Sequence, residues 1–168
     1  GNVIQFNEIH GNPGSLTGVH NYVATLTLNA KKNWWGSNTG PTIAANIGGT
    51  GDAVSDYVNY APWCTNEACS PIDETPPTTT FVSGLPASLT NQTSASITID
   101  GTDVLYYKSK LDDGSYSAAI AVGTPIGLSG LAAGSHTLYV VGRDQAGNWQ
   151  AEGSATTYTW TIDLTPPA

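Results

Sequence analysis

The sequence predicts an all-β protein with almost no helix, and three observations support this. Charged residues make up only 11% of the 168 residues, too few for the polar faces of amphipathic helices. The chain contains 19 glycines and 10 prolines, the residues that make turns and end strands. Between them lie short runs in which every second residue is apolar, separated by threonine and serine, which is the pattern of half-buried strands.

The charge of the chain excludes several classes of partner. The formal net charge is −8, and Lys and Arg together number only five. Nucleic acids and anionic membrane surfaces need clustered positive charge, so we expect neither as a partner. No apolar run approaches the roughly 20 residues that span a bilayer, so we expect no membrane insertion. The chain has no methionine, which we interpret as a processed piece of a longer protein.

A repeated segment predicts the domain boundaries. Asp-Glu-Thr-Pro-Pro begins at Asp73, and Asp-Leu-Thr-Pro-Pro begins 90 residues later at Asp163. Two consecutive prolines enforce an extended spacer that cannot continue a β-ladder, and 90 residues suffice for a two-sheet sandwich. The sequence therefore predicts domains at 1–72 and 73–163, followed by 164–168 as the linker stub to a next module of a tandem array.

Residues 1–72 carry the spacing of stacked parallel strands. Ile4 and Leu26 belong to apolar-alternating runs, and their separation along the chain suits one coil of a solenoid. Asparagines suit the corners of such coils, and they occur at Asn7, Asn12, Asn29 and Asn33. Two coils are too few to fold alone, so we expect the solenoid to continue upstream.

Two motifs in this region resemble a known family. Asn-Ala-Lys-Lys-Asn-Trp-Trp-Gly-Ser-Asn-Thr-Gly-Pro at 29–41 is followed by Gly-Asp-Ala-Val-Ser-Asp-Tyr-Val-Asn-Tyr-Ala-Pro-Trp-Cys at 51–64. Together they resemble the closing segment of right-handed parallel β-helix proteins of the pectin-lyase-like class, over about residues 1–69. The resemblance implies the terminal turns of a β-helix. That class includes polysaccharide lyases, hydrolases and epimerases, whose catalytic residues lie on turns that we expect this chain to lack.

The adjacent indoles Trp34 and Trp35 have two interpretations. Successive strand side chains face opposite ways, so both cannot enter one core from a regular strand. We favour a cap, in which Trp34, Trp35 and Trp63 cover the open end of the last coil and prevent edge-to-edge aggregation. The alternative is a ligand-binding platform for sugar rings, with Trp34, Trp35 and Trp149 as the candidate residues.

The two cysteines, Cys64 and Cys69, are predicted to form a local disulfide. Zinc would need two further soft ligands nearby, and the three histidines show no such spacing. A disulfide favours an oxidising location, so we expect a secreted or cell-surface protein.

Residues 73–163 are predicted to form a series of short strands. Alternation places ten residues on inward faces: Ile97, Ile99, Leu105, Tyr107, Leu111, Leu138, Val140, Tyr158, Trp160 and Ile162. Gly-Ser-His-Thr-Leu at 134–138, leading into Asp-Gln-Ala-Gly-Asn at 144–148, resembles bacterial extracellular immunoglobulin-like or fibronectin-like modules. The resemblance implies an immunoglobulin-like β-sandwich that serves as a spacer or adhesive unit.

Oxygen-bearing side chains near the predicted domain boundary are candidates for a Ca²⁺ site. In an immunoglobulin-like sandwich, two loops lie at the end where the chain enters, and these would bring together Asp73, Glu74, Asp100, Asp103, Asp144 and Asn148. We favour the simpler alternative that Asp144 and Asn148 hydrogen-bond a tight turn around Gly147. No cofactor other than this candidate calcium is predicted.

The remaining polar residues do not form a catalytic set in the sequence. We expect His136 to make a structural hydrogen bond or to be exposed, and Asp112 and Asp113 to belong to a hairpin. Tyr106 and Tyr139 alternate with inward residues and should face solvent. We predict a non-catalytic spacer or adhesive region of a secreted bacterial multidomain protein. The alternative is an accessory carbohydrate-binding region of a polysaccharide lyase or glycoside hydrolase. The expected partners are polysaccharides, cell-surface proteins and neighbouring modules.

Overall fold

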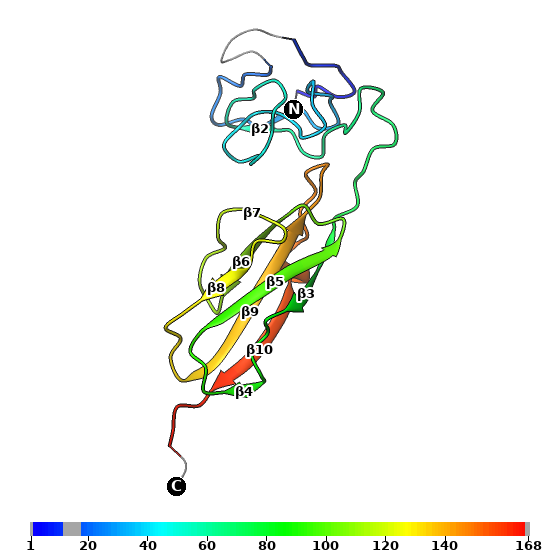
Figure 1. The fold of residues 1–168 in the computed structure, drawn as a ribbon. Coiled ribbons are helices and arrows are strands. Elements are labelled where there is room, and N and C mark those ends of the chain that lie inside the picture. Colours follow the sequence, from blue (N-terminus) through cyan, green and yellow to red (C-terminus); the bar gives the residue numbers. More distant parts are fainter. Residues whose placement is uncertain (1, 12–17, 167–168) are drawn as a thin grey trace. The chain divides into compact units, whose positions relative to one another are not determined.

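The computed structural model describes residues 2–11 and 18–166, and these divide into two compact units (Figure 1). The N-terminal unit runs to Thr75 and also includes Gln145–Asn148. The C-terminal unit comprises Pro76–Asp144 and the residues from Trp149 onward. In the described ranges the regular structure is strand, with one 3-10 helix, η1 (Glu152–Ser154), and no α-helix. The chain is therefore all-β, as predicted.

The N-terminal unit is built from short parallel pairings instead of long strands. Three segments run in the same direction side by side, in the order 2–9, 28–34 and 58–64. At their centre, β1 (Leu28–Asn29) pairs with β2 (Val58–Asn59). Further parallel bridges join Val3 to Asn29, Glu8 to Trp34, Val19 to Val54 and Pro41 to Gly51. The unit is a stack of parallel segments with long connections between them.

The predicted coil, which would place Ile4 beside Leu26, is too short. A coil of that length would pair Val3 with Thr25. In the structure Val3 pairs with Asn29, which lies 29 − 25 = 4 residues further along the chain. Leu26 is exposed and belongs to a turn in which its N–H donates to the carbonyl of Val23 at 3.1 Å. Apolar alternation identified the segments, but it does not reveal how much of the chain the turn between them takes up.

Two tryptophans form the centre of the N-terminal core. Trp35 and Trp63 are 0% and 1% exposed, and they lie in one cluster with Ala30, Val54 and Val58. Trp63 also donates its indole N–H to the carbonyl of Asn38 at 3.1 Å. A core with two fully buried indoles gains much of its stability from these two side chains.

A buried asparagine ties two of the parallel segments together. Asn33 is 0% exposed, and its Oδ1 accepts the backbone N–H of Asn7 at 2.9 Å. Its Nδ2 donates to the carbonyls of Ile4 and Ala30, each at 2.8 Å. The amide thereby satisfies backbone groups that the irregular pairing leaves over. Of the asparagines predicted at corners, Asn12 lies outside the described residues.

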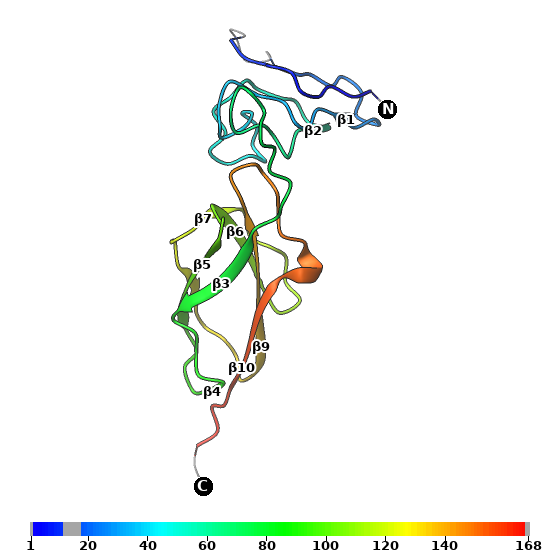
Figure 2. The same cartoon turned by 90° about the vertical axis from the view of Figure 1, so that its right-hand side faces the viewer.

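The C-terminal unit consists of two β-sheets that share one core (Figure 2). The five-stranded sheet has the order β4 (Leu89–Thr90), β10 (Thr156–Ile162), β9 (Gly134–Arg143), β6 (Tyr106–Leu111) and β7 (Ile120–Ala121). The three-stranded sheet has the order β3 (Thr78–Ser83), β5 (Ala95–Thr102) and β8 (Ile126–Leu128). All pairings are antiparallel except that of β4 with β10. The arrangement is sandwich-like.

The core of this unit lies between the two sheets. The five-stranded sheet contributes Tyr107, Leu138, Val140, Trp160 and Ile162, and the three-stranded sheet contributes Ile97, Ile99 and Ile126. Leu111 and Tyr158 are half-buried and pack against this cluster. The alternation of apolar residues therefore predicted this core correctly, because each sheet has one face toward the core and one toward solvent.

Leu105 is the exception among the predicted inward residues, since it is 42% exposed. It precedes β6 and follows a turn in which Asp103 has a φ of 61°. Val104, the residue before it, is half-buried, and its methyl groups lie close to where a Cβ would stand on Gly101 and Gly142. The turn shifts the alternation by one residue at this point.

Candidate functional site

The Asp and Thr residues of the two Asp-x-Thr-Pro-Pro segments make the same side-chain-to-backbone hydrogen bond. Asp73 Oδ1 accepts the N–H of Thr75 at 2.9 Å, and Asp163 Oδ1 accepts the N–H of Thr165 at 2.9 Å. This Asx turn holds the chain in a fixed direction immediately before the two prolines. The sequence repeat is therefore also a repeat of hydrogen bonding, and the two copies flank the two-sheet unit.

The chain enters and leaves the C-terminal unit at opposite ends of its sheets. Near the start of β3, Thr79 Oγ1 lies 2.7 Å from the Oγ1 of Thr156, the first residue of β10. The chain leaves after Ile162, at the other end of β10. A seven-residue strand extends about 20 Å, so the unit separates its two linkers by at least the length of that strand.

A buried glutamine fastens the beginning of β3. Gln150 is 8% exposed, and its Oε1 accepts hydrogen bonds from Thr79 Oγ1 at 3.0 Å and from the N–H of Gly142 at 3.3 Å. Its Nε2 donates to the carbonyl of Ser154 at 2.6 Å. One side chain thus joins the first strand of the unit to β9 and η1. Sequence reasoning missed this role, because the partners are far apart in the chain.

The six predicted calcium ligands lie in different surroundings. Asp73, Glu74 and Asn148 belong to the N-terminal unit. There Glu74 forms an ion pair with Lys32 at 2.9 Å, and Asn148 donates its Nδ2 to the backbone carbonyl of Asp73 at 3.0 Å. Asn148 therefore fastens the turn around Gly147 to the segment at Asp73, and the predicted hydrogen bonds within that turn stay a prediction.

The other three predicted ligands belong to the C-terminal unit. A carboxylate oxygen of Asp103 lies within 4.8 Å of a carboxylate oxygen of Asp144. Asp100 is exposed, and its Oδ1 accepts the N–H of Gly101 at 2.8 Å. Ca²⁺ takes six to eight oxygen ligands, so Asp103 and Asp144 could supply only part of such a set. Calcium binding therefore stays a prediction.

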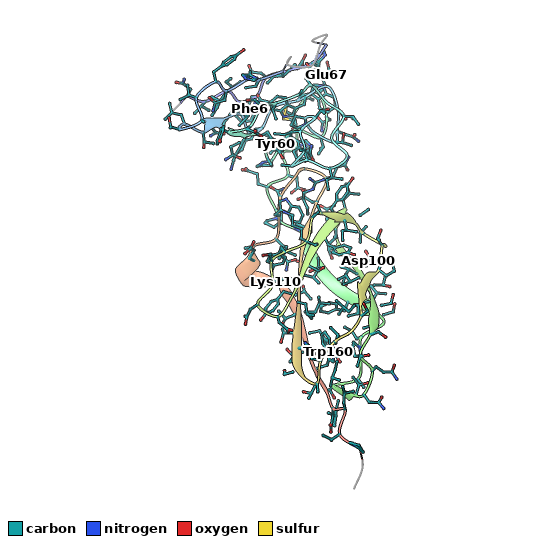
Figure 3. All side chains as sticks on the ribbon, turned by 90° about the vertical axis from the view of Figure 1, so that its left-hand side faces the viewer. Phe6, Tyr60, Glu67, Asp100, Lys110 and Trp160 are labelled. Atoms are coloured by element: carbon teal, nitrogen blue, oxygen red, sulfur yellow. A yellow bond between two sulfur atoms is a disulfide. The ribbon has the colours of Figure 1, made fainter. Side chains whose placement is uncertain are left out.

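One acidic cluster was not predicted. In the N-terminal unit, Glu8, His10 and Glu67 each place one ligand atom within 4.8 Å of the others, and all three are exposed (Glu67 is labelled in Figure 3). Glu8 and Glu67 lie near opposite ends of the unit's sequence, so no local spacing could have revealed the cluster. Exposed acidic groups often gather without a metal, so this cluster alone defines no site.

The predicted tryptophan residues differ in accessibility. Trp35 is fully buried, so its ring offers no face to a ligand in this structure, and sugar binding there is not carried further. The sequence could not decide this, because alternation only showed that one of the adjacent indoles points inward. Trp34 and Trp149 are half-buried and keep part of each ring accessible.

Cys64 and Cys69 form a disulfide, with their Cα atoms 4.8 Å apart. This bond is consistent with an extracytoplasmic location. Among the described residues, no helix is long and apolar enough to cross a membrane.

His136 and Asp112 form a hydrogen-bonded pair at the end of the two-sheet unit. His136 Nδ1 lies 2.8 Å from Asp112 Oδ2, and its Nε2 lies 3.0 Å from the carbonyl of Ala132. Asp112 Oδ1 also accepts the N–H of Thr137 at 2.7 Å. Both ring nitrogens therefore face acceptors, an arrangement that favours the doubly protonated imidazolium. The predicted structural hydrogen bond of His136 is present.

This pair shifts both pKa values. The hydrogen bond to Asp112, followed by the one to the Ala132 carbonyl, raises the pKa of His136 above its usual value. Burial tends to raise the pKa of Asp112, but its hydrogen bonds with the Thr137 N–H and with His136 together lower it. Asp112 follows β6 directly and bonds both the ring of His136 and the backbone of Thr137 in β9. The pair therefore holds the turn after β6 against β9.

A row of cations and aromatic rings lies along β6, β9 and Trp149. Arg143 stands over the ring of Tyr106 at 4.5 Å, and Lys108 stands over the ring of Trp149 at 4.4 Å. Lys110 stands over the ring of Tyr139 at 4.7 Å (Lys110 is labelled in Figure 3). We call Tyr106, Lys108, Lys110, Tyr116, Tyr139, Arg143 and Trp149 the cation–aromatic row. Tyr106 and Tyr139 were expected to face solvent; both are half-buried.

No family model and no curated protein matches this sequence.

Proposed function

We propose that the chain is a non-catalytic structural region of a secreted or cell-surface bacterial multidomain protein. In this proposal the N-terminal unit is the end of a right-handed parallel β-helix, and the C-terminal unit is an immunoglobulin-like spacer in a tandem array. The observation that carries the proposal is the pair of Asx turns with the same backbone hydrogen bond, in the two Asp-x-Thr-Pro-Pro segments on either side of the two-sheet unit. A repeated linker with a repeated hydrogen bond is what a chain of similar modules needs.

The geometry of the C-terminal unit supports the spacer function. Its two linkers attach at opposite ends of the sheets, so the unit adds its own strand length to the distance that the chain spans. Buried hydrogen bonds of Gln150 and Thr79 fasten the strand where the chain enters. A unit held in this way transmits tension along its strands instead of opening at the first of them.

The N-terminal unit supports the β-helix interpretation through its parallel stacking. Segment 2–9 uses one edge for hydrogen bonds to segment 28–34, and apolar side chains around it are exposed, among them Val3 at 58% and Phe6 at 62% (Phe6 is labelled in Figure 3). A further parallel coil stacked on this segment would cover such side chains.

Force spectroscopy on the fragment 73–166 tests the spacer function. If the unit bears load as one body, pulling on its two linkers produces a single unfolding event that releases about 30 nm of chain. The Gln150→Ala variant should unfold at lower force, because β3 loses its fastening. The exposed Gln92→Ala change is the matched control and should leave the force unchanged. Extension without a distinct unfolding event would contradict the proposal.

The second candidate function is that of an accessory carbohydrate-binding region of a polysaccharide-degrading enzyme. The observation that favours it is the set of half-exposed aromatic rings at Trp149, Tyr106 and Tyr139 on one face of the five-stranded sheet. Aromatic faces with polar neighbours suit contacts with sugar rings. Retention of the purified protein on at least one of a panel of immobilised polysaccharides would support this function, and retention on none would remove it.

A further inference from the structure

The five-stranded sheet separates charge in an unusual way for so acidic a chain. The sequence contains 13 Asp and Glu residues and five Lys and Arg residues. None of the acidic residues lies in β4, β10, β9, β6 or β7. Three of the five cations, Lys108, Lys110 and Arg143, lie in β6 and β9, and they are the only Lys or Arg residues of the C-terminal unit. This sheet carries cationic and no acidic side chains, in a protein whose formal net charge is −8.

The three cations share the outer face of the sheet. In the ladder between β6 and β9, Tyr106 pairs with Arg143, Lys108 with Val141 and Lys110 with Tyr139. The residues between them, Tyr107 and Val140, are in the core. Because side chains alternate along a strand, the members of the row in β6 and β9 face away from the core, and the cations on β6 repeat about every 7 Å.

The aromatic rings complete a platform around these charges. Trp149 lies between Lys108 at 4.4 Å and Arg143 at 5.8 Å, and Lys110 lies between Tyr139 at 4.7 Å and Tyr116 at 5.4 Å. Arg143 is 3% exposed, so it positions the rings, while the two lysines and the aromatic residues remain half-exposed. The adjacent strand β10 adds the exposed hydroxyls of Thr157, Thr159 and Thr161.

We propose that this outer face of the five-stranded sheet binds an anionic polysaccharide, a polymer of uronic acid or of sulfated sugar. The carboxylate or sulfate groups would contact Lys108 and Lys110, and the sugar rings would contact the accessible parts of Trp149 and Tyr139 that the cations leave uncovered. The proposal deepens the second candidate function, on which it rests, by naming the site and the charge of the ligand.

Charge complementarity decides between this ligand and a neutral sugar chain. The lysines could donate hydrogen bonds to the hydroxyls of a neutral glycan, but a carboxylate or sulfate group would gain charge attraction in addition. The acidic residue Glu152 in η1 is close enough to Tyr116 to raise the pKa of its phenol, in addition to the larger rise that burial causes. Glu152 therefore places a negative charge near the Tyr116 end of the cation–aromatic row. An acidic peptide offers similar charges but no ring faces for the aromatic residues.

The test measures binding of the full chain to alginate, a uronic-acid polymer, in low salt. The Lys108→Gln/Lys110→Gln double variant should bind about tenfold or more weakly. The Lys31→Gln/Lys32→Gln double variant has the same net charge and should bind within about twofold of the unchanged protein. Binding of the unchanged protein should also weaken steeply between about 20 and about 300 mM NaCl. Trp149→Ala should weaken binding as well, and Trp149→Phe should weaken it less.

These measurements distinguish a wrong binding site from a wrong binding function. Equal binding by both double variants would overturn the site while leaving carbohydrate binding intact. Equal binding to alginate and to neutral dextran would overturn the anionic class. Stronger binding to poly-L-glutamate than to alginate would show a peptide surface instead. No binding to any polysaccharide would overturn the second candidate function together with this proposal. Circular dichroism of each variant shows that the sheet is retained.

Discussion

The two units of this chain satisfy their backbone hydrogen bonds in different ways. In the C-terminal unit, long antiparallel ladders do so, with seven paired positions between β9 and β10 alone. In the N-terminal unit, the named strands have two residues each, separate backbone hydrogen bonds join the segments, and side chains such as Asn33 satisfy further backbone groups. A regular ladder spreads stability over many equivalent bonds, whereas an irregular stack concentrates it in a few buried side chains.

The cores show the same contrast. The C-terminal core draws on both sheets, and Trp160 is one of eight buried members. Among the described residues of the N-terminal unit, the core has five buried members, of which Trp35 and Trp63 are much the largest. We therefore expect single substitutions to act locally, each on the unit that contains it, and to be most damaging where one side chain has many roles.

The largest effects should come from the buried indoles. Trp160→Ala should lower the free energy of unfolding of the C-terminal unit by about 3 to 5 kcal/mol, and Trp35→Ala should do the same to the N-terminal unit. Differential scanning calorimetry of each variant shows which transition moves. Tyr22→Ala, at a residue 87% exposed, is the control and should move neither. A change of both transitions by either tryptophan variant would show that the units do not unfold separately.

The buried amides sharpen the comparison. Asn33→Ala leaves the N–H of Asn7 and the carbonyls of Ile4 and Ala30 without this partner, and we expect a loss of about 3 kcal/mol from the N-terminal unit. Gln150→Ala should cost the C-terminal unit less, about 2 kcal/mol, because the ladders around it persist. Urea denaturation provides both values. If Gln150→Ala proved the more damaging, the contrast between ladder and side-chain bonding would fail.

The disulfide should stabilise only the N-terminal unit. Cys64 and Cys69 close a short loop, and a loop of this size restricts the unfolded chain by about 2 kcal/mol. Cys64→Ser/Cys69→Ser, or reduction with a thiol, should lower the calorimetric transition of the N-terminal unit and leave that of the two-sheet unit in place. A shift of the C-terminal transition on reduction would contradict this assignment.

The smallest predicted effect is a pH dependence confined to the C-terminal unit. The pKa of His136 is raised, so its contribution is complete below the unfolded value of about 6.5 and disappears as pH rises through the folded value. The pKa of Asp112 is lowered, so its contribution is present above about 3.9 and disappears as pH falls through its folded value. The pair should therefore stabilise most between about pH 4 and pH 6.5.

Melting temperatures measured from pH 3 to pH 9 check this expectation. His136→Gln should flatten the decline above about pH 6.5, and Asp112→Asn should flatten both sides of the maximum. Asp113→Asn, at the exposed neighbour in the same hairpin, is the control. A pH profile unchanged by His136→Gln would contradict the stabilising role of the His136–Asp112 pair.

The sequence predicted the C-terminal unit better than the N-terminal one, and the cause is physical. A strand with one buried face shows its orientation in every second residue, so Ile97, Ile99, Leu138 and Val140 were placed correctly. The exception, Leu105, follows a turn at Asp103 where the alternation shifts. In the N-terminal unit the pairing of Val3 with Asn29 depends on the length of a turn, which leaves no periodic pattern.

The candidate sites divide along similar lines. The cysteine pair and the structural hydrogen bond of His136 follow from local spacing and residue type. The cation–aromatic row was foreseen only as scattered exposed aromatics, because it depends on the register between β6 and β9, which brings Lys110 beside Tyr139. The fastening by Gln150 depends on contacts between residues far apart along the chain, and no pattern in the sequence indicates it.

Urea unfolding of the isolated fragment 73–166 carrying Trp149→Phe, followed by the fluorescence of Trp160 as its single tryptophan, tests most directly whether the repeated linker encloses an independent module. If the two-sheet unit is such a module, the fragment is folded at low urea, with a buried indole, and loses this signal in one cooperative transition. A fragment whose tryptophan emission is already that of an exposed indole without urea, and which shows no transition, would contradict the account.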